Sequence, residues 1–201
     1  MKKLIVGTLF TALVLTGCKT NTQYIDPADA EQNITVGLSY ADFQLAAQTM
    51  ADEMIASPLL VHPKAAQGGR YILHVNNITN DTMQRVDTDQ LVKTIRVRLL
   101  NSGKFVVTTA FNGEDNMTKD VRGLSDSEMV KKSSVKKSGT VLAPDYSLSG
   151  KILQRNASLD NGDTRIEYYF QLTLTNLENG LAYWEGEKVI GKLSGADTVA
   201  W

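Results

Sequence analysis

The sequence predicts an α+β fold, a mixed sheet with flanking helices and a C-terminal antiparallel meander. The clearest observation is that three alternating segments close the chain, separated by Asn-Gly turns at 161–162 and 179–180. Asn-Gly between alternating runs is a strong hairpin signal, because both turn positions need a positive φ. The second observation is that two segments with helical spacing precede these strands. Helices packed on the apolar face of such a sheet define the α+β class.

Residues 1–17 predict a lipoprotein signal peptide. Lys2 and Lys3 are basic, and the apolar stretch that follows, 4–15, is too short to span a bilayer. The segment Leu15-Thr16-Gly17-Cys18 resembles the lipobox, so Cys18 is the predicted lipidation site. The alternative is a plain secretory signal with an incidental cysteine. Cys18 is the only cysteine, so its acylation leaves none for disulfides or thiol catalysis.

Residues 18–38 are predicted to be the lipidated cysteine and a short polar tether, and 39–201 a periplasmic globular domain. Two or more acyl chains anchor a protein stably. An Asp directly after the lipidated cysteine resembles the signal for retention in the inner membrane. Because Lys19 stands there instead, the predicted location is the periplasmic face of the outer membrane. The lipid is the only predicted membrane attachment. About 20 tether residues reach at most about 70 Å when extended, and about 25 Å as a flexible coil.

The first predicted element of the domain is a helix at 40–56. Ser39 and Asp42 form a capping box before it, and Pro58 ends it. Its apolar residues recur at helical spacing: Phe43, Ala47, Met50 and Met54. The two methionines are predicted to pack in the core, which is favoured over a soft binding stripe.

A strand is predicted at 71–78, followed by a polar loop at 76–81. The next helix, at 88–102, has Asp87 as its cap and Gly103 at its end. Its apolar stripe comprises Leu91, Val92, Ile95 and Leu99. Its basic face is predicted to be solvated and comprises Lys93, Arg96 and Arg98. A short strand follows at 105–109.

Residues 112–145 are rich in Ser, Lys, Asp and Gly, and one or two short helices are expected there. Their predicted anchors are Leu124, Met129 and Val130. A basic cluster comprises Lys131, Lys132, Lys136 and Lys137. It is predicted to be a mobile, solvated segment, in preference to a site for a polyanion or an acidic partner.

The meander strands are predicted at 146–158, 164–176 and 181–190. The middle strand alternates cleanly, so one face is buried and the other is solvated or binds a partner. The buried side chains are predicted to be Ile166, Tyr168, Phe170, Leu172 and Leu174. Arg165, Glu167, Gln171 and Thr173 are predicted on the other face.

Few residues suggest catalysis. His62 and His74 lie outside any recognisable metal spacing, and the acidic turn at 160–163 lacks the ligand pattern of a calcium loop. The formal charge is −1, or −3 once Lys2 and Lys3 are removed, which gives no reason to expect nucleic-acid binding. We therefore expect a binding module without catalytic residues, cofactor or metal.

Three segments in order resemble one family. They are Val75-Asn76-Asn77-Ile78-Thr79-Asn80, Leu100-Asn101-Ser102-Gly103-Lys104-Phe105 and Tyr183-Trp184-Glu185-Gly186. Together with the lipobox, they resemble the LpoB family of outer-membrane lipoproteins, which activate penicillin-binding proteins. The resemblance covers about residues 40–195. It implies a fold similar to the N-terminal domain of TolB.

The resemblance also implies a partner, a class A penicillin-binding protein, which is a bifunctional peptidoglycan synthase. Family members dock on a small accessory domain of that enzyme and stimulate it. The predicted contact residues are Asn76, Asn77, Thr79, Asn80 and Asp81. The structural alternative, that these side chains only cap the strand end, stays open.

One feature departs from the family. Well-known members carry a long proline-rich linker, whereas this tether is short and has one proline, Pro27. A similar domain also occurs in lipoproteins that assemble surface structures, including the curli secretion lipoprotein. The alternative function is therefore a structural or assembly lipoprotein of the envelope, acting as an oligomeric scaffold. A stable homo-oligomer would favour that alternative.

Overall fold

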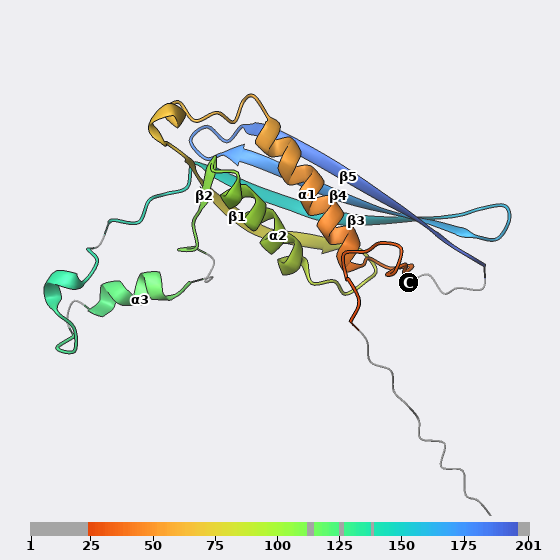
Figure 1. The fold of residues 1–201 in the computed structure, drawn as a ribbon, viewed down its shortest axis with the longest axis horizontal. Helices are drawn as coiled ribbons and strands as arrows, with labels where there is room; N and C mark the ends of the chain where they lie inside the picture. Colours follow the sequence, from red (N-terminus) through yellow and green to blue (C-terminus); the bar gives the residue numbers. More distant parts are fainter. Residues whose placement is uncertain (1–23, 112–114, 125–126, 138, 197–201) are drawn as a thin grey trace, which may run out of the picture.

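The structure is a computed structural model that describes residues 24–111, 115–124, 127–137 and 139–196. A single five-stranded sheet carries helices α1 and α2 on one face, and α3 lies apart on the connection between β2 and β3 (Figure 1). The elements are α1 Tyr40–Ala56, β1 Tyr71–Asp81, α2 Thr88–Asn101, β2 Phe105–Val107, α3 Met117–Gly123, β3 Tyr146–Ser158, β4 Thr164–Asn176 and β5 Ala182–Ser194.

The sheet is mixed, with strand order β2-β1-β3-β4-β5. β1 runs parallel to both β2 and β3, whereas β3, β4 and β5 form the antiparallel meander. Parallel neighbours need a crossover connection, and α2 supplies it between β1 and β2. The predicted α+β class and meander are confirmed. The likeness to the N-terminal domain of TolB stays a prediction.

Helix α1 begins and packs as its sequence predicts. The Ser39 hydroxyl oxygen accepts a hydrogen bond from the Asp42 backbone N–H, and the Asp42 carboxylate accepts one from the Ser39 backbone N–H. Met50 and Met54 are fully buried, which confirms their place in the core. The Phe43 ring meets Phe170 of β4 edge to face at 5.8 Å. This contact joins the helix layer to the centre of the sheet.

Helix α2 also follows its prediction. Asp87 caps it by accepting from the Asp89 backbone at 3.0 Å. Gly103 follows its end with φ +72°, a conformation that glycine adopts at low cost. All four residues of the predicted stripe are buried: Leu91, Val92, Ile95 and Leu99. The middle strand of the meander likewise buries all five of its predicted core residues.

The predicted polar loop at 76–81 is wrong, because β1 continues through it to Asp81. The pairing with β3 shifts register between Val75 and Ile78, where a bulge inserts an extra residue. Leu73, Val75 and Ile78 are therefore all buried, although the last step is three residues rather than two. The bulge therefore returns the side chains of β1 to the core face of the sheet after Asn76 and Asn77.

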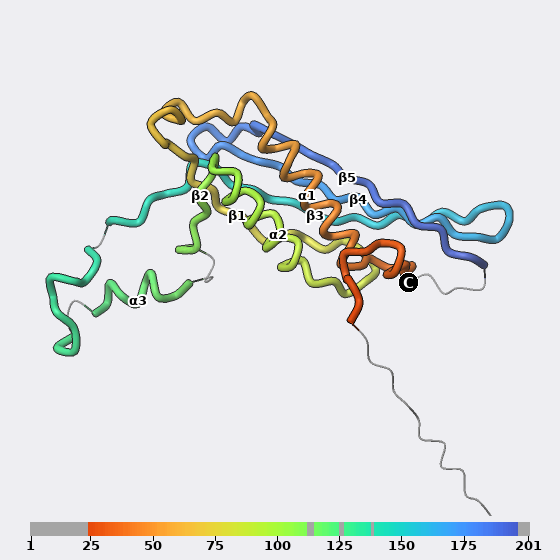
Figure 2. Tube along the Cα trace, in the orientation of Figure 1, coloured from red at the N-terminus to blue at the C-terminus, as the bar shows by residue number. Residues whose placement is uncertain are grey.

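The connection between β2 and β3 departs most from the sequence-based expectation. Helix α3 lies earlier than the predicted anchors, and no described residue of 110–145 is buried. The anchors are exposed or half-buried, with Met129 94% exposed, so they do not hold helices against a core. The four lysines of the basic cluster are exposed. Figure 2 traces this excursion away from the sheet.

Three boundaries also differ. β2 ends at Val107 rather than at residue 109, and β5 continues to Ser194 rather than ending at residue 190. Val36 and Leu38, at the end of the predicted tether, pack against the hydrophobic core. Residues 1–23, with the signal peptide and Cys18, lie outside the described residues.

Candidate functional site

The second of the three family-like motifs, at residues 100–105, is structural. Gly103 turns the chain, and Lys104 then donates from its Nζ to the Ile55 carbonyl at 2.6 Å. That carbonyl belongs to the last turn of α1, where a cation interacts favourably with the helix dipole. Phe105 is fully buried next to it. This motif joins the ends of both helices to β2.

The Trp-x-Gly motif is structural as well. The Trp184 indole lies where a side chain at residue 186 would stand, so any Cβ added to Gly186 overlaps its six-membered ring. Tyr183 meets Tyr146 edge to face at 5.5 Å. The motif therefore packs the start of β5.

Two of the predicted contact residues stabilise β1 itself. Asn76 donates from its side chain to Ser147 Oγ at 2.7 Å, and Asn80 donates to the Gln84 carbonyl at 2.8 Å. Asn80 Oδ1 also accepts from the hydroxyl and the backbone N–H of Thr82. For these two asparagines, the contacts support the structural alternative.

The other three predicted contact residues are exposed. Among the described residues, the side chains of Asn77, Thr79 and Asp81 make no hydrogen bond or ion pair. Thr79 pairs in register with Lys151 of β3, and Asp81 with Leu153. Directly paired residues share one face of a sheet, so Thr79 and Asp81 lie on the face opposite the two helices.

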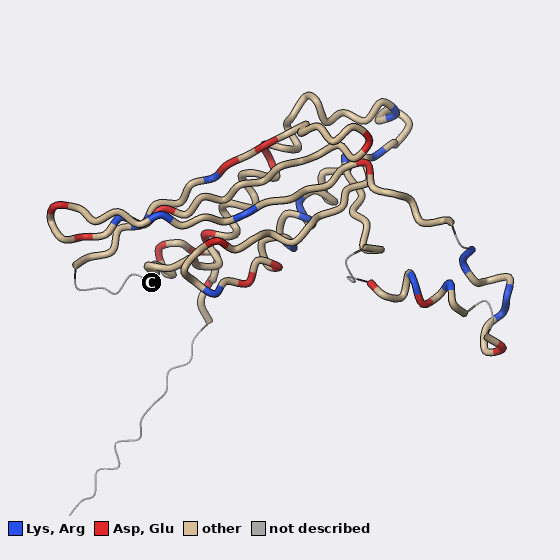
Figure 3. Tube along the Cα trace, turned by 180° about the vertical axis from the view of Figure 1, so that it is seen from behind, with Lys and Arg blue, Asp and Glu red and all other residues tan. Residues whose placement is uncertain are grey.

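This helix-free face carries a row of apolar side chains at its centre. Leu153, Tyr169 and Val189 are aligned in register across β3, β4 and β5. Leu153 and Tyr169 are half-buried, and Val189 is 42% exposed. Figure 3 shows the chain from the side opposite the helices, with the positions of Lys and Arg in blue and those of Asp and Glu in red. We call the row and its polar neighbours the open-face patch; the neighbours are Lys151, Gln171, Glu187, Arg155 and Glu167.

The tyrosine at the centre of the patch is held in place. The Arg155 guanidinium lies 5.3 Å from the Tyr169 ring centre, and the Tyr169 hydroxyl donates to Glu167 Oε2 at 2.7 Å. This hydrogen bond raises the pKa of Tyr169, because the neighbouring carboxylate retains the phenol proton. Arg165 completes the cluster through an ion pair with Glu167 at 3.2 Å. The aromatic side chain is therefore oriented before any partner arrives.

On the other side of the apolar row, Gln171 donates to Glu187 at 2.6 Å. An aromatic centre within a polar, charged rim is the usual anatomy of a protein-binding surface. The sequence prediction placed polar residues on this face but missed Leu153, Tyr169 and Val189. The sequence did contain a signal for Tyr169, because this aromatic residue occupies a position of the alternating strand where the other residues are polar.

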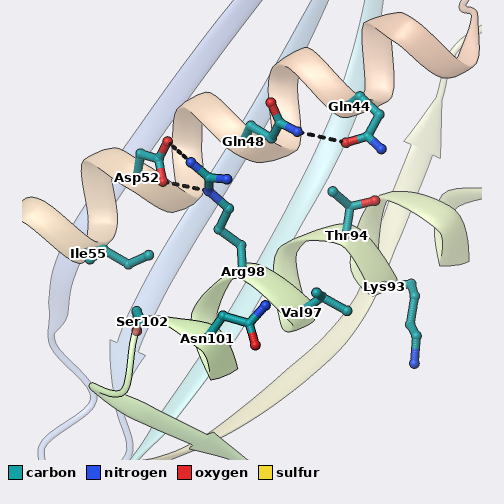
Figure 4. Close-up of a pocket in the computed structure, with 10 residues that line it drawn as sticks. All are labelled: Gln44, Gln48, Asp52, Ile55, Lys93, Thr94, Val97, Arg98, Asn101 and Ser102. Atoms are coloured by element: carbon teal, nitrogen blue, oxygen red, sulfur yellow. Dashed lines mark hydrogen bonds and ion pairs between the residues drawn. The ribbon is translucent and has the colours of Figure 1, made fainter. Parts of the chain in front are cut away.

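A second candidate surface is a groove of about 510 Å³ between α1 and α2 (Figure 4). In this groove, Arg98 donates from Nε and Nη2 to the two carboxylate oxygens of Asp52, at 2.7 and 2.6 Å. These hydrogen bonds lower the pKa of Asp52. Arg98 was expected on a solvated basic face; it is exposed there and also links the two helices. The other polar side chains lining the groove are Gln44, Gln48, Lys93, Thr94, Asn101 and Ser102.

The remaining sequence candidates have structural surroundings. His62 packs against Tyr71 at 4.9 Å, and His74 against Phe111 at 5.9 Å. The turn at 160–163 connects β3 to β4, with Gly162 at φ +90°. Within the described part of the chain, no three metal-ligating side chains cluster. In that same part, no helix has the length and apolar character needed to cross a membrane.

The fold is an α+β domain whose sheet carries two helices on one face and the open-face patch on the other. A family model described as "Peptidoglycan-synthase activator LpoB" matches residues 42–190, which is more than half of the chain. The chain therefore belongs to the LpoB family. That description names an activator of an enzyme rather than an enzyme. A comparison with curated proteins found no match.

Solved structures of that family are similar to this chain. The LpoB C-terminal domain from Salmonella enterica is 16% identical, with a TM-score of 0.45, over 74% of this chain and 98% of that one. The corresponding domain from Escherichia coli is 15% identical, with a TM-score of 0.43, over 75% and 99%. The NMR structure of E. coli LpoB is 15% identical, with a TM-score of 0.42, over 94% and 83%.

Proposed function

We propose that this protein is an outer-membrane lipoprotein that binds and activates a class A penicillin-binding protein. Membership of a family described as peptidoglycan-synthase activators carries the proposal. The lipid anchor is Cys18, behind a signal peptide of 17 residues, and the domain faces the periplasm.

The proposed mechanism is allosteric, because the family is described as an activator of a synthase rather than as an enzyme. It stimulates the synthase by binding the active enzyme conformation more tightly than the inactive one. The same coupling requires that the active conformation bind the lipoprotein more tightly in return.

The open-face patch is the proposed docking surface. Its Tyr169 is preorganised by Arg155 and Glu167, so little side-chain freedom is lost on binding. Thr79 and Asp81 extend the patch along β1. Their side chains are exposed and, within the described part of the chain, make no hydrogen bond or ion pair that would compete with a partner. The polar α1–α2 groove has no aromatic side chain among its lining residues, and we therefore assign docking to the patch.

The test is polymerisation of lipid II by the class A synthase of the same organism, with and without this protein. We expect stimulation, and Tyr169→Ala should weaken binding by roughly 30-fold, as loss of an interface hot spot does. Gln48→Ala, in the groove, is the matched control and should bind normally. Absence of stimulation with every class A synthase of that organism would refute the activator function. Normal binding by Tyr169→Ala would place docking elsewhere.

One observation favours a second candidate, the oligomeric envelope scaffold. β5 is an edge strand of 13 residues, and β4 is its only partner in the described sheet. Such an edge can pair with another chain, although charged side chains such as Lys188 oppose this. Light scattering of the purified domain distinguishes the candidates. The activator is expected to be a monomer that binds one synthase, and the scaffold a stable oligomer.

A further inference from the structure

Lys192 of β5 binds a segment that lies 157 residues earlier in the chain. Its Nζ donates to the carbonyl oxygens of Thr35 and Gly37, at 2.9 and 2.5 Å. It also pairs with Asp42 Oδ2 at 2.6 Å. An ammonium group has three N–H donors, and these three contacts use all of them. The Lys192 and Asp42 side chains are only 15% and 13% exposed, so water screens this pair weakly.

Asp42 connects the same contact to the start of α1. Its Oδ2 accepts from the Ser39 backbone at 2.7 Å and from the Ser39 hydroxyl at 2.9 Å. One carboxylate thus holds the helix cap and the Lys192 ammonium together. Residues 35–38 with Lys192 and Asp42 are called the clasp below.

Gln84 holds the clasp from the other side. It accepts from the Leu38 backbone at 3.0 Å and donates to the Tyr168 hydroxyl at 2.7 Å. Gly37 lies directly against it, because a Cβ at this position would stand 2.7 Å from Gln84 Nε2. These contacts fix residues 35–38 to both the sheet and the turn after β1.

The residues before the clasp are held differently. Between residues 26 and 33 the chain folds on itself, with Asn33 donating to the carbonyls of Asp26 and Asp29 at 2.8 and 2.7 Å. Asp29 Oδ1 accepts from two following backbone N–H groups. Ile34, next to this coil, is 83% exposed. Local hydrogen bonds of this kind, most of them exposed, open at low cost.

We propose that the clasp sets where the membrane tether ends and that the coil at 26–33 is a reserve of tether length. With the clasp closed, the coil straightens under extension while the domain stays intact. Its eight residues then span up to about 27 Å. Opening the clasp would add residues 34–38 to the length of the tether. This inference rests on the lipid anchor of the proposed function, and it addresses the reach of a short tether.

Hydrogen exchange on the full lipidated chain in phospholipid vesicles tests the clasp without any synthase. Lys192→Met removes the ammonium, and Gly37→Ala displaces Gln84 without touching the ion pair. Both variants should speed exchange at the Leu38 and Ser39 amides roughly tenfold or more, while exchange in the middle of α1 stays unchanged. Lys188→Met is the matched control for Lys192→Met. Gly191→Ala is the control for Gly37→Ala, because a Cβ added at residue 191 has no heavy atom within 4 Å.

Unchanged exchange at Leu38 and Ser39 in both variants would refute the clasp. Equally fast exchange across 24–38 in the wild-type chain would do the same. The second variant controls for general unfolding, because Gly37→Ala leaves the half-buried Asp42 paired with Lys192.

The length reserve has its own test in cells. Gly37→Ala should raise synthase activation in cells while leaving the purified lipid II reaction unchanged. Insertion of a long flexible linker after Cys18 should do the same. If exchange accelerates but neither change alters activation in cells, tether length does not limit the protein and the reserve is refuted. Failure of the purified reaction would instead refute the proposed function.

Discussion

Phe170→Ala is the sharpest test of the sheet's orientation. Phe170 is 1% exposed, and its ring meets Phe43 of α1 at 5.8 Å with an interplanar angle of 86°. Truncation of a buried phenylalanine costs about 3–5 kcal/mol, and about 1 kcal/mol of that reflects the lost aromatic pair. Domains of this kind are stable by about 5–15 kcal/mol, so the variant should lose about a fifth or more of the free energy of unfolding.

The assay is urea denaturation of a form that begins at Tyr24, so that the clasp is kept. With a slope of about 2 kcal/mol per molar urea, the midpoint should fall by about 2 M while the slope is unchanged. Gln171→Ala changes the next residue on the opposite face and should cost less than about 1 kcal/mol. A loss below about 1 kcal/mol for Phe170→Ala, or equal losses for both, would mean that the assigned faces of β4 are reversed.

Three further predictions concern single positions. Gly150→Ala should destabilise the domain by about 1–3 kcal/mol, because its Cβ overlaps a backbone carbonyl of β4; Gly191→Ala, whose Cβ meets nothing, should not. Asp52→Asn should cost a little stability at pH 7. Because Arg98 lowers the folded pKa of Asp52, this stabilisation is present above the ordinary value of 3.8 and fades as the pH falls below it; a loss that is constant with pH would contradict the ion pair. Cys18→Ala should release the protein from the outer-membrane fraction, and continued sedimentation with that fraction would exclude Cys18 as the anchor.

The helices and the meander could be predicted because their signals are local. A capping box at Ser39 and a cap at Asp87 define where the helices begin, and period-two alternation in 164–176 defines which side chains are buried. Each of these depends on residues a few positions apart. The polar run at 76–81 carries no such signal, because asparagine side chains fit a turn as readily as a bulged strand.

The candidate site was predictable only in part. Thr79 and Asp81 were expected to meet a partner and do lie on the open face, whereas Asn76 and Asn80 bond within the domain. Tyr169 could have been found from its phase in the strand. Its alignment with Leu153 and Val189 could not, because register between strands depends on pairing across two hairpins.

The α+β class, both long helices and the buried face of the meander can be predicted from the amino-acid sequence, as can the family-like motifs. Three features appear only in the folded chain: the course of β1, the apolar row on the open face and the clasp. The two groups differ in the range of the interactions on which they depend. Helix caps, turns and alternation act over a few residues, whereas Lys192 meets Thr35 across 157 positions. That contact exists only because β5 and α1 pack side by side once the sheet has formed.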